Sequence, residues 1–526
     1  MSGAIPAETA KARLHAGGEI ALLDVREHGQ YGEGHPFLAV PCPYSRLETA
    51  VGALVPRTTV PILLVDDGDG VAEKAARRLA SLGYGDISWI EGGAPAWAAA
   101  GFTLFKGVNV PSKTLGELVE EEWHVPMLPP EALDAWRAEG RPFQLFDGRP
   151  LSEYAKMTIP GARAMPNGEL PHRLQAAVTD AATPVVVNCA GRTRGIIGAA
   201  GLMLAGIANP VFALENGTQG WALSGRSLAR GSSPDPLPVE EAAESRARGR
   251  ALADRFGISW LSGEEVARLS EDETRTLYFF DVRLAQEFAA GSHPDAVHAP
   301  GGQLVQATDQ WIGLRRARVV TACDTGLRAT LAAFWLKQMG YEVYVLPDVA
   351  AQRGWRLARP AEPKRPEFPR LPEIDAAAAL AAAEAGAVLL DLRDSMAFRA
   401  GHLAPARWAI RPRFAEAGLK AGEPVCLVGE PDVAATAALD LREMGVARMA
   451  RVTGDPVAWR AAGLPVVESP DDPDDTAAID FLFFVHDRHD GNLDSARRYL
   501  AWELGLTRQL DPAERAEYRL ENIAFG

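Results

Sequence analysis

The sequence is poor in cysteine, in net positive charge and in long apolar runs, and each shortage excludes a class of protein. Four cysteines occur in 526 residues, at positions 42, 189, 323 and 426. Their wide spacing excludes the close pairing of a disulfide scaffold or a zinc site. No apolar run approaches the roughly 20 residues that cross a bilayer, and Met1 to Ala10 lack a basic stretch followed by an apolar core. We therefore expect a soluble, cytoplasmic protein.

The composition is acidic and otherwise that of an ordinary globular protein. The net charge of -15 and the pI near 5.3 argue against nucleic acid or an anionic membrane as a partner, because such a surface repels both. Hydrophobic residues make up 47% and charged residues 23%, which argues against wholesale disorder. A chain of 526 residues is several times the usual domain size, so several hydrophobic cores are expected.

Two landmarks recur four times, at intervals of roughly 100 to 135 residues. In the first, an apolar strand ends in aspartate, arginine follows two residues later, and an aromatic residue lies five residues beyond the arginine. We interpret each aspartate and arginine as a structural ion pair. The sets are Asp24, Arg26, Tyr31; Asp147, Arg149, Tyr154; Asp281, Arg283, Phe288; and Asp391, Arg393, Phe398.

The second landmark is a turn before a tryptophan near the end of each repeat, at Trp97, Trp221, Trp355 and Trp459. We expect these indoles to anchor hydrophobic cores, because each buries a large area in a small domain. Between the landmarks lie an aliphatic run, a polar loop and an alanine-rich helical pattern. Alternating strands and helices predict an α/β fold, with a mainly parallel sheet covered by helices on both faces.

Composition divides the chain into four domains and a tail. The repeats predict domains at residues 1–105, 127–230, 255–359 and 371–468. Linkers are expected at 106–127, 231–249 and 359–372, where proline and charged residues concentrate. After an acidic hinge at 470–475, residues 476–526 do not repeat the pattern. We expect this segment to be mainly helical and to pack on the domains.

The acidic-x-Arg element, the turn before tryptophan and the loop between strand and helix together resemble the rhodanese superfamily over about the first 465 residues. The fourfold arrangement is similar to the multidomain bacterial rhodanese-related sulfurtransferases. The resemblance implies four tandem rhodanese-like α/β/α domains. It also implies a loop cysteine that accepts sulfane sulfur from a donor such as thiosulfate and passes it to a thiophilic acceptor. Because fold alone does not give activity, the loops decide.

The second repeat has the loop that this chemistry needs. Cys189 would sit among backbone N–H groups at a helix N-terminus, where the dipole and two guanidinium groups favour the thiolate and lower its pKa. We predict Cys189 as the catalytic residue, and Arg192 and Arg194 as the groups that neutralise the donor. The predicted substrate-binding residues are Ala190, Gly191, Arg192, Thr193, Arg194 and Gly195.

The third repeat offers a second candidate, Cys323, in a loop that ends with Arg328. Asp324 beside the thiol should raise its pKa and weaken anion binding, so Cys189 is favoured as the principal site. The first and fourth loops, 66–70 and 429–432, begin without cysteine and are acidic. A carboxylate cannot form a persulfide, and we predict that these two repeats are inactive.

The expected reaction is a double displacement. The Cys189 thiolate attacks the outer sulfur of thiosulfate, sulfite leaves, and cyanide or a thiol attacks the resulting persulfide. No metal or organic cofactor is required, and the oligomeric state is left open. Cys42 and Cys426 are interpreted as buried small hydrophobic residues. The segment His486 to Asn492 is interpreted as a charged turn before a helix rather than a metal site.

Three alternatives stay open. A rhodanese-like phosphatase is disfavoured, because four residues separate Cys189 from Arg194, whereas the resemblance to those phosphatases calls for five. A non-catalytic scaffold that binds a partner or relays persulfide sulfur is compatible with two inactive repeats. The donor could be 3-mercaptopyruvate, which is also anionic.

Overall fold

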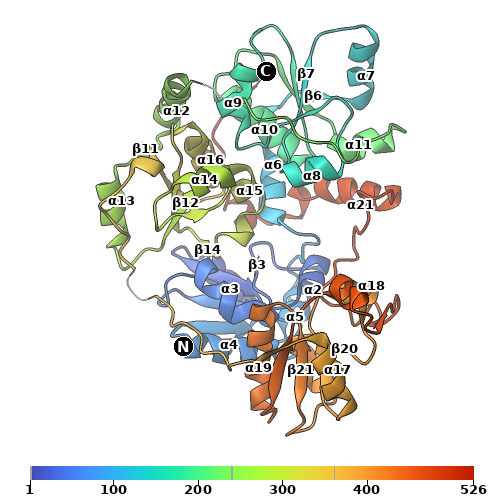
Figure 1. Ribbon diagram of the computed structural model, residues 1–526. Coiled ribbons are helices and arrows are strands. Elements are labelled where there is room, and N and C mark those ends of the chain that lie inside the picture. The colour runs from blue at the N-terminus through green and yellow to red at the C-terminus, as the bar shows by residue number, and fades with distance from the viewer. Residues whose placement is uncertain (1–2, 239–240, 360–361, 526) are drawn as a thin grey trace. The chain divides into compact units, whose positions relative to one another are not determined.

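The computed structural model describes residues 3–238, 241–359 and 362–525 (Figure 1). Four predicted segments extend outside the described residues. They are the first domain at its N-terminal end, the expected linkers 231–249 and 359–372, and the tail at its last residue. The chain forms two compact units. One contains residues 3–14, 21–108 and 362–484, which hold most of the first repeat and the fourth repeat. The other contains residues 15–20, 109–238, 241–359 and 485–525, which hold the second and third.

Each repeat forms a sheet with the same parallel strand order. The short first strand lies at one edge, beside the last long strand, followed by the central strand and the strand that ends in aspartate. In the first repeat the order is β1 (Gly3–Ile5), β5 (Ile87–Ile90), β4 (Ile62–Val65), β2 (Ile20–Asp24) and β3 (Val40–Pro41). In the second it is β6 (Met127–Leu128), β10 (Val211–Leu214), β9 (Val185–Asn188), β7 (Gln144–Asp147) and β8 (Arg163–Ala164).

The other two sheets follow the same order. In the third repeat it is β11 (Ser259–Trp260), β16 (Glu342–Leu346), β15 (Arg318–Ala322), β12 (Leu277–Asp281) and β13 (Val297–His298). In the fourth it is β17 (Glu373–Ile374), β22 (Met449–Val452), β21 (Val425–Val428), β18 (Val388–Asp391) and β20 (Arg407–Trp408). The predicted fold class, four tandem α/β domains with mainly parallel sheets, is confirmed.

Helices cover the sheets, because each parallel pair of strands needs a crossover connection. The first repeat has α1 (Ala7–His15), α2 (His28–Glu33), α3 (Leu47–Leu54), α4 (Val71–Ser81) and α5 (Gly93–Ala99). The second has α7 (Pro130–Ala138), α8 (Leu151–Lys156), α9 (Leu170–Ala177), α10 (Thr193–Leu204) and α11 (Gly217–Leu223). The third has α13 (Gly263–Ser270), α14 (Ala285–Ala290), α15 (Gly301–Gln306) and α16 (Leu327–Gln338), and the fourth α17 (Ala376–Glu384), α18 (Ser395–Ala400), α19 (Pro431–Glu443) and α20 (Pro456–Ala461).

Both landmarks have the structural roles expected of them. Each arginine pairs with its aspartate, and its Nη2 also donates to a backbone carbonyl eight residues along the chain. The carboxylate–guanidinium distances are 2.6 Å for Asp24–Arg26, Asp147–Arg149 and Asp281–Arg283, and 2.5 Å for Asp391–Arg393. Of the four tryptophans, Trp97, Trp221 and Trp459 are buried, whereas Trp355 is half-buried and stacks on His293.

Two segments expected to be linkers contain helices. Helix α6 (Val110–Trp123) lies within 106–127, and α12 (Ala242–Phe256) begins within 231–249. Lys113 and Glu117 of α6 are buried, and their partners, Trp502 and Arg192, come from distant parts of the chain. The expected linker at 359–372 contains no helix or strand among its described residues.

The C-terminal segment is helical only in part. Residues 476–492 form turns and stretches without regular secondary structure, and α21 (Leu493–Leu504) and α22 (Pro512–Arg515) follow. Figure 1 shows α21 beside α11 and α6, with which it is in contact. The segment His486 to Asn492 is a turn before α21, as predicted, with the Asn492 side chain accepting from the backbone N–H of Ser495. In the described residues, no helix has the length and apolarity to cross a membrane.

Candidate active site

The Cys189 loop joins the central strand β9 to α10. The backbone N–H groups of Gly191 and Gly195 favour the Cys189 thiolate and act to lower its pKa. Behind it, the Cys189 carbonyl accepts from the N–H of Thr218 at 2.8 Å, which ties the loop to the start of α11. Gly195 lies in the first turn of α10, where a Cβ atom would be 3.7 Å from the sulfur. The sulfur therefore lies at a helix N-terminus, near two amides that favour its anion.

The pKa of Cys189 is shifted in the opposite direction from the one expected. Burial raises the pKa of this thiol to about 11, and the carboxylate of Glu503 adds to the rise. The charge of Arg194 and the two loop amides lower it, but not enough to offset burial. Only 2% of Cys189 is exposed, so the resting side chain is a neutral thiol at pH 7. The sequence prediction of a lowered pKa was wrong, because burial could not be deduced from the loop residues.

The positive charge of the Arg194 guanidinium acts to lower the pKa of Cys189. Its Nη1 and Nη2 also form a bidentate pair with Glu153 of α8, at 2.7 and 2.9 Å. Asn167 fixes the backbone of the same residue, since its Nδ2 donates to the Arg194 carbonyl at 2.7 Å. The cation beside the sulfur is thus already neutralised in part by a carboxylate.

Arg192 is directed toward α6 instead. Its Nε and Nη2 lie 2.9 Å from the carboxylate oxygens of Glu117, and Nη2 also contacts Glu120. The Ala190 carbonyl is likewise occupied, because it accepts from the N–H of Gln219 at 3.0 Å. These contacts give both residues a role in holding the loop.

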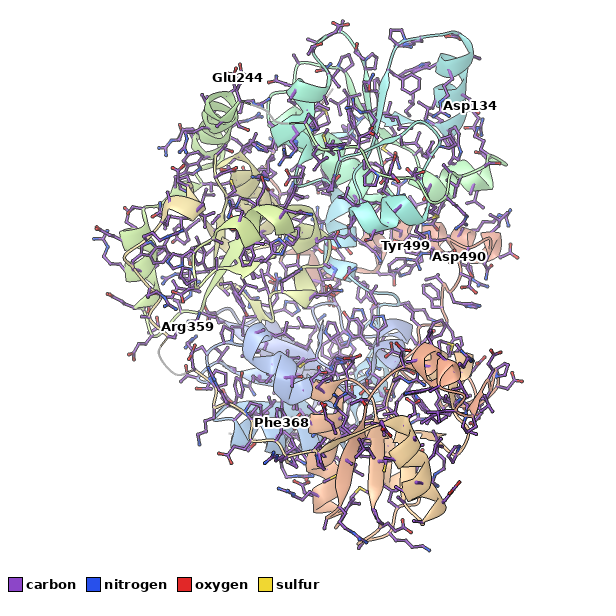
Figure 2. All side chains as sticks on the ribbon, viewed as in Figure 1. Asp134, Glu244, Arg359, Phe368, Asp490 and Tyr499 are labelled. Atoms are coloured by element: carbon purple, nitrogen blue, oxygen red, sulfur yellow. The ribbon has the colours of Figure 1, made fainter. Side chains whose placement is uncertain are left out.

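A residue from outside the repeats completes the loop. The Thr193 hydroxyl donates to Oε1 of Glu503 at 2.7 Å. Gly191 packs against the same helix, since a Cβ there would lie 2.9 Å from Glu503 Oε2 and 3.0 Å from Tyr499 Cε1. Figure 2 labels Tyr499 on α21. The C-terminal helix therefore forms a wall of the Cys189 site.

The second cysteine loop joins β15 to α16. The Gly326 N–H donates to the Cys323 sulfur at 3.0 Å, and the side chain is fully buried. Burial raises the pKa of Cys323, the charge of Arg328 opposes the rise, and Asp324 adds to it. The expected effect of Asp324 has the right direction, but burial is the larger cause.

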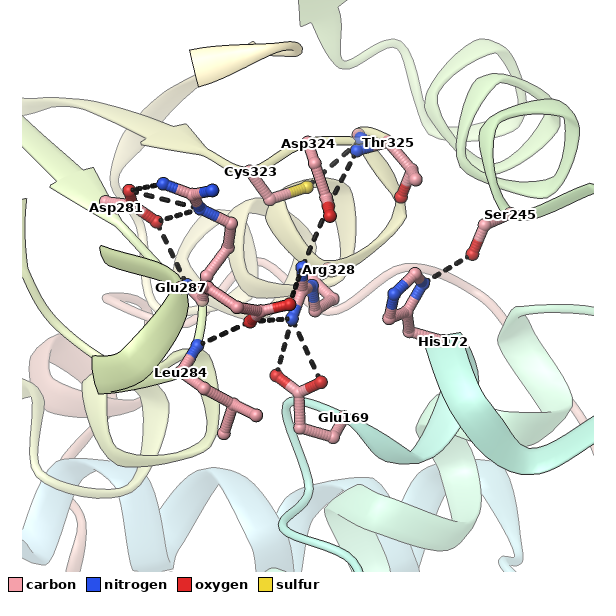
Figure 3. Close-up of polar contacts among 12 residues, drawn as sticks. Glu169, His172, Ser245, Asp281, Leu284, Glu287, Cys323, Asp324, Thr325 and Arg328 are labelled. Carbon is pink, nitrogen blue, oxygen red and sulfur yellow. Dashed lines mark hydrogen bonds and ion pairs between the residues drawn. The ribbon is translucent and has the colours of Figure 1, made fainter. Parts of the chain in front are cut away.

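Three carboxylates surround the cation of this loop. Figure 3 shows the Arg328 guanidinium between Glu169, Glu287 and Asp324, with nearest distances of 2.9, 2.7 and 2.8 Å. Glu169 comes from the second repeat and reaches into the third. So many negative charges leave Arg328 little capacity to hold a dianionic donor.

Comparisons with known proteins agree with this architecture. A family model described as a rhodanese-like domain matches residues 6–100, 129–224 and 262–348, more than half of the chain. A crystal structure of a thiosulfate sulfurtransferase from Pseudomonas aeruginosa is 36% identical, covers 99% of this chain and 100% of its own, and superposes with a TM-score of 0.87. The chain belongs to the rhodanese family.

Other similar structures match smaller parts of the rhodanese array. The Alr3790 protein from Anabaena sp. is 23% identical over 24% of this chain and 93% of its own, with a TM-score of 0.19. A structure of an EanB variant that carries a cysteine persulfide, with ergothioneine, is 17% identical over 66% of this chain and 96% of its own, with a TM-score of 0.25. No curated protein matches the sequence.

The two loops without cysteine differ from the Cys189 loop in different ways. The first has a carboxylate in place of the thiol, and the fourth has fewer residues between strand and helix. In the first repeat the Asp66 carboxylate accepts from the N–H groups of Gly68 and Ala72, both at 2.9 Å. The amides at the positions of Gly191 and Gly195 are thus hydrogen-bonded to a carboxylate in the first repeat. In the fourth, β21 ends at Val428 and α19 begins at Pro431, which leaves two residues for the loop. These features support the prediction that both repeats are inactive.

The remaining cysteines are buried, as their interpretation requires. Cys426 lies in β21 and Cys42 follows β3, and burial raises the pKa of both, that of Cys42 to about 12. Glu117, Glu153 and Glu503 were not predicted as site residues. Glu153 could have been found four residues after Arg149 in the repeat, but the other two lie outside the repeats and carried no signal.

Proposed function

We propose that the chain is a thiosulfate sulfurtransferase in which Cys189 carries the transferred sulfur as a persulfide. The observation that supports this most strongly is the placement of the Cys189 sulfur at the N-terminus of α10, beside Gly195, where the loop amides and Arg194 act to lower its pKa. The similarity to a thiosulfate sulfurtransferase over nearly the whole chain supports thiosulfate as the donor. The unpaired state of Cys42, Cys189, Cys323 and Cys426 suits a reducing compartment, so we place the reaction in the cytoplasm.

In the first half-reaction the Cys189 thiol gives up its proton, which leaves with the product as hydrogen sulfite, and the resulting thiolate attacks the outer sulfur of thiosulfate. A sulfur–sulfur bond forms, the bond inside thiosulfate breaks, and sulfite leaves with the electron pair. The amides of Gly191 and Gly195 then stabilise the persulfide anion, as an oxyanion hole would. Arg194 offsets the charge of the donor and of sulfite. Arg192 supports the loop through Glu117.

In the second half-reaction a thiophilic acceptor, cyanide or a thiol, attacks the outer sulfur of the persulfide. The Cys189 sulfur leaves, and the resting protein is restored. Cys323 is the secondary candidate in this scheme. The three carboxylates around Arg328 argue against thiosulfate binding at that loop.

The test is mass spectrometry of the protein after thiosulfate treatment, with sulfite release measured in parallel. We expect Cys189 to gain one sulfur atom that cyanide removes. Cys189→Ala should abolish both signals, and Cys323→Ala should keep them. The same assay with 3-mercaptopyruvate separates the two donors. Hydrolysis of an aryl phosphate without sulfite release would establish the phosphatase instead, and no adduct from either donor would support a binding scaffold.

A further inference from the structure

Glu503 reaches the Cys189 site from a helix outside the four repeats. Ser495, Tyr499 and Glu503 lie one turn apart on α21 and form its buried face. Glu503 is only 1% exposed, although a carboxylate is rarely buried without partners that offset its charge. Glu503 is therefore a candidate for a chemical role in addition to packing.

The two oxygens of Glu503 have different surroundings. Oε1 accepts from the Thr193 hydroxyl at 2.7 Å and lies 3.5 Å from the Tyr499 hydroxyl. Oε2 is buried, and among the described residues it accepts no hydrogen bond. It faces Gly191, where a Cβ would be 2.9 Å away. One oxygen is thus fixed to the loop, and the other is directed at it with a hydrogen-bonding position to fill.

The charge of Glu503 opposes the first half-reaction. This charge contributes an upward shift to the pKa of Cys189 and of Arg192 in the loop. It does the same to Lys113 and Glu117 of α6 and to Tyr499 of its own helix. A carboxylate here raises the pKa of the thiol and repels a dianionic donor. A site built only to accept sulfur from thiosulfate would do better without it. A group that receives a proton is useful when the acceptor is a thiol, because only the thiolate attacks sulfur.

We propose that Glu503 is the proton acceptor of the second half-reaction, taking the proton of an acceptor thiol through Oε2. This rests on the proposed function. The acceptor S–H bond breaks and its proton moves to Glu503, while the acceptor sulfur bonds to the outer sulfur of the persulfide. The bond from that sulfur to Cys189 breaks, and the electron pair stays on Cys189. Because the pKa of Cys189 is raised, its thiolate then takes the proton from Glu503, and both groups return to their resting forms.

The test compares two acceptors in single-turnover reactions at pH 7 with protein already carrying the persulfide. The first acceptor is 2-mercaptoethanol, which is protonated at this pH, and the second is thionitrobenzoate, an aromatic thiol that is already ionised. Glu503→Gln should lower the rate with 2-mercaptoethanol about a hundredfold. With thionitrobenzoate the rate should stay the same or rise, because no proton has to leave and a repelling charge is gone. Glu503→Asp should restore part of the rate with 2-mercaptoethanol.

The matched control is Asp494→Asn on the same helix, since this exposed carboxylate pairs with the exposed Arg497. It should change neither rate. Equal losses with both acceptors in Glu503→Gln would show a structural role and overturn the inference, as would no loss with either.

Loading with inorganic polysulfide keeps this outcome separate from the donor question. If thiosulfate gives no adduct but polysulfide does, the proposed donor fails while the acceptor comparison still decides the role of Glu503. If neither reagent places sulfur on Cys189, the proposed function and the role of Glu503 are both overturned.

Discussion

The guanidinium of Arg194 is paired with the carboxylate of Glu153 through two hydrogen bonds, at 2.7 and 2.9 Å. Burial alone would raise the pKa of Glu153, but the contact with Arg194 outweighs it and holds the pKa below its ordinary value. Glu153 is therefore charged at pH 7 and offsets the cation that faces Cys189. Glu153→Gln keeps an oxygen for the hydrogen bond and removes that charge. We expect the KM for thiosulfate to fall about fivefold, which corresponds to about 1 kcal/mol for a partly exposed pair.

Glu131→Gln is the control for this change, because Glu131 is an exposed carboxylate of the same repeat that contacts Arg226. It should leave the KM unchanged. A higher KM in Glu153→Gln would show that Glu153 positions Arg194 rather than attenuating its charge.

The raised pKa of Cys189 predicts how fast this thiol is alkylated. With a pKa of about 11, the thiolate fraction at pH 7.5 is about a hundredfold smaller than that of an ordinary cysteine. Iodoacetamide labelling of the Cys189 peptide, followed by mass spectrometry, should therefore be slow and should rise about tenfold per pH unit up to the pKa. The folded pKa lies above the ordinary value, so the neutral thiol contributes stability that is lost as the pH rises toward 11. Fast labelling at pH 7.5 would contradict the burial of this residue.

The fold could be predicted because its sequence signals are local. An aspartate at the end of a strand, an arginine two residues later and a tryptophan after a turn each act within one repeat, and four copies can be compared. The cysteine at the start of the β9–α10 loop could be located in the same way. These features need no knowledge of how the repeats pack.

The electrostatics of the site could not be predicted, because they depend on contacts distant in sequence. Arg192 is bound by Glu117, which lies 75 residues earlier, and Thr193 contacts Glu503, which lies 310 residues later. Neither partner lies in a repeat, so no second copy revealed it. Without those partners two arginines beside Cys189 indicate a lowered pKa, whereas with them and with burial the pKa rises.

A glycine in α10 lies beside a cavity between the second and third repeats, and a substitution there tests whether the cavity has room for a methyl group. Gly201 lines this cavity, and a Cβ there would meet no atom within 4 Å. Gly201→Ala should therefore raise the free energy of unfolding by about 0.5–1 kcal/mol, because alanine favours the helix and restricts the unfolded chain. Thermal and urea denaturation measure this, and sulfite release should be unchanged.

Gly198→Ala on the same helix is the matched comparison with the opposite expectation. Its Cβ would lie 2.6 Å from Asn167 Oδ1 and 3.0 Å from Val187 Cγ1. Asn167 would have to move, and it holds the Arg194 carbonyl. We expect lower stability and slower sulfite release. Equal stabilities of the two variants would show that Gly198 has more space than its neighbours indicate.

A buried ion pair joins the first and fourth repeats within their unit. Nη1 and Nη2 of Arg411 lie 2.6 and 2.8 Å from the carboxylate of Glu48, and Nη2 is also 2.8 Å from Asp440. Arg411→Met leaves the Glu48 charge buried without its main partner, which should cost about 3–5 kcal/mol. Hydrogen exchange of the β4 and β21 amides in the full chain measures this loss.

The reason for that cost can be isolated with two further variants. Arg77→Met breaks an exposed pair with Glu73 and should cost less than about 0.5 kcal/mol. Adding Glu48→Gln to Arg411→Met removes the isolated charge, so protection of β4 and β21 should recover in part. If the double variant exchanges faster than Arg411→Met, the loss comes from packing of the arginine side chain against Tyr44 rather than from the unpaired carboxylate, since that ring lies 4.2 Å from the guanidinium carbon.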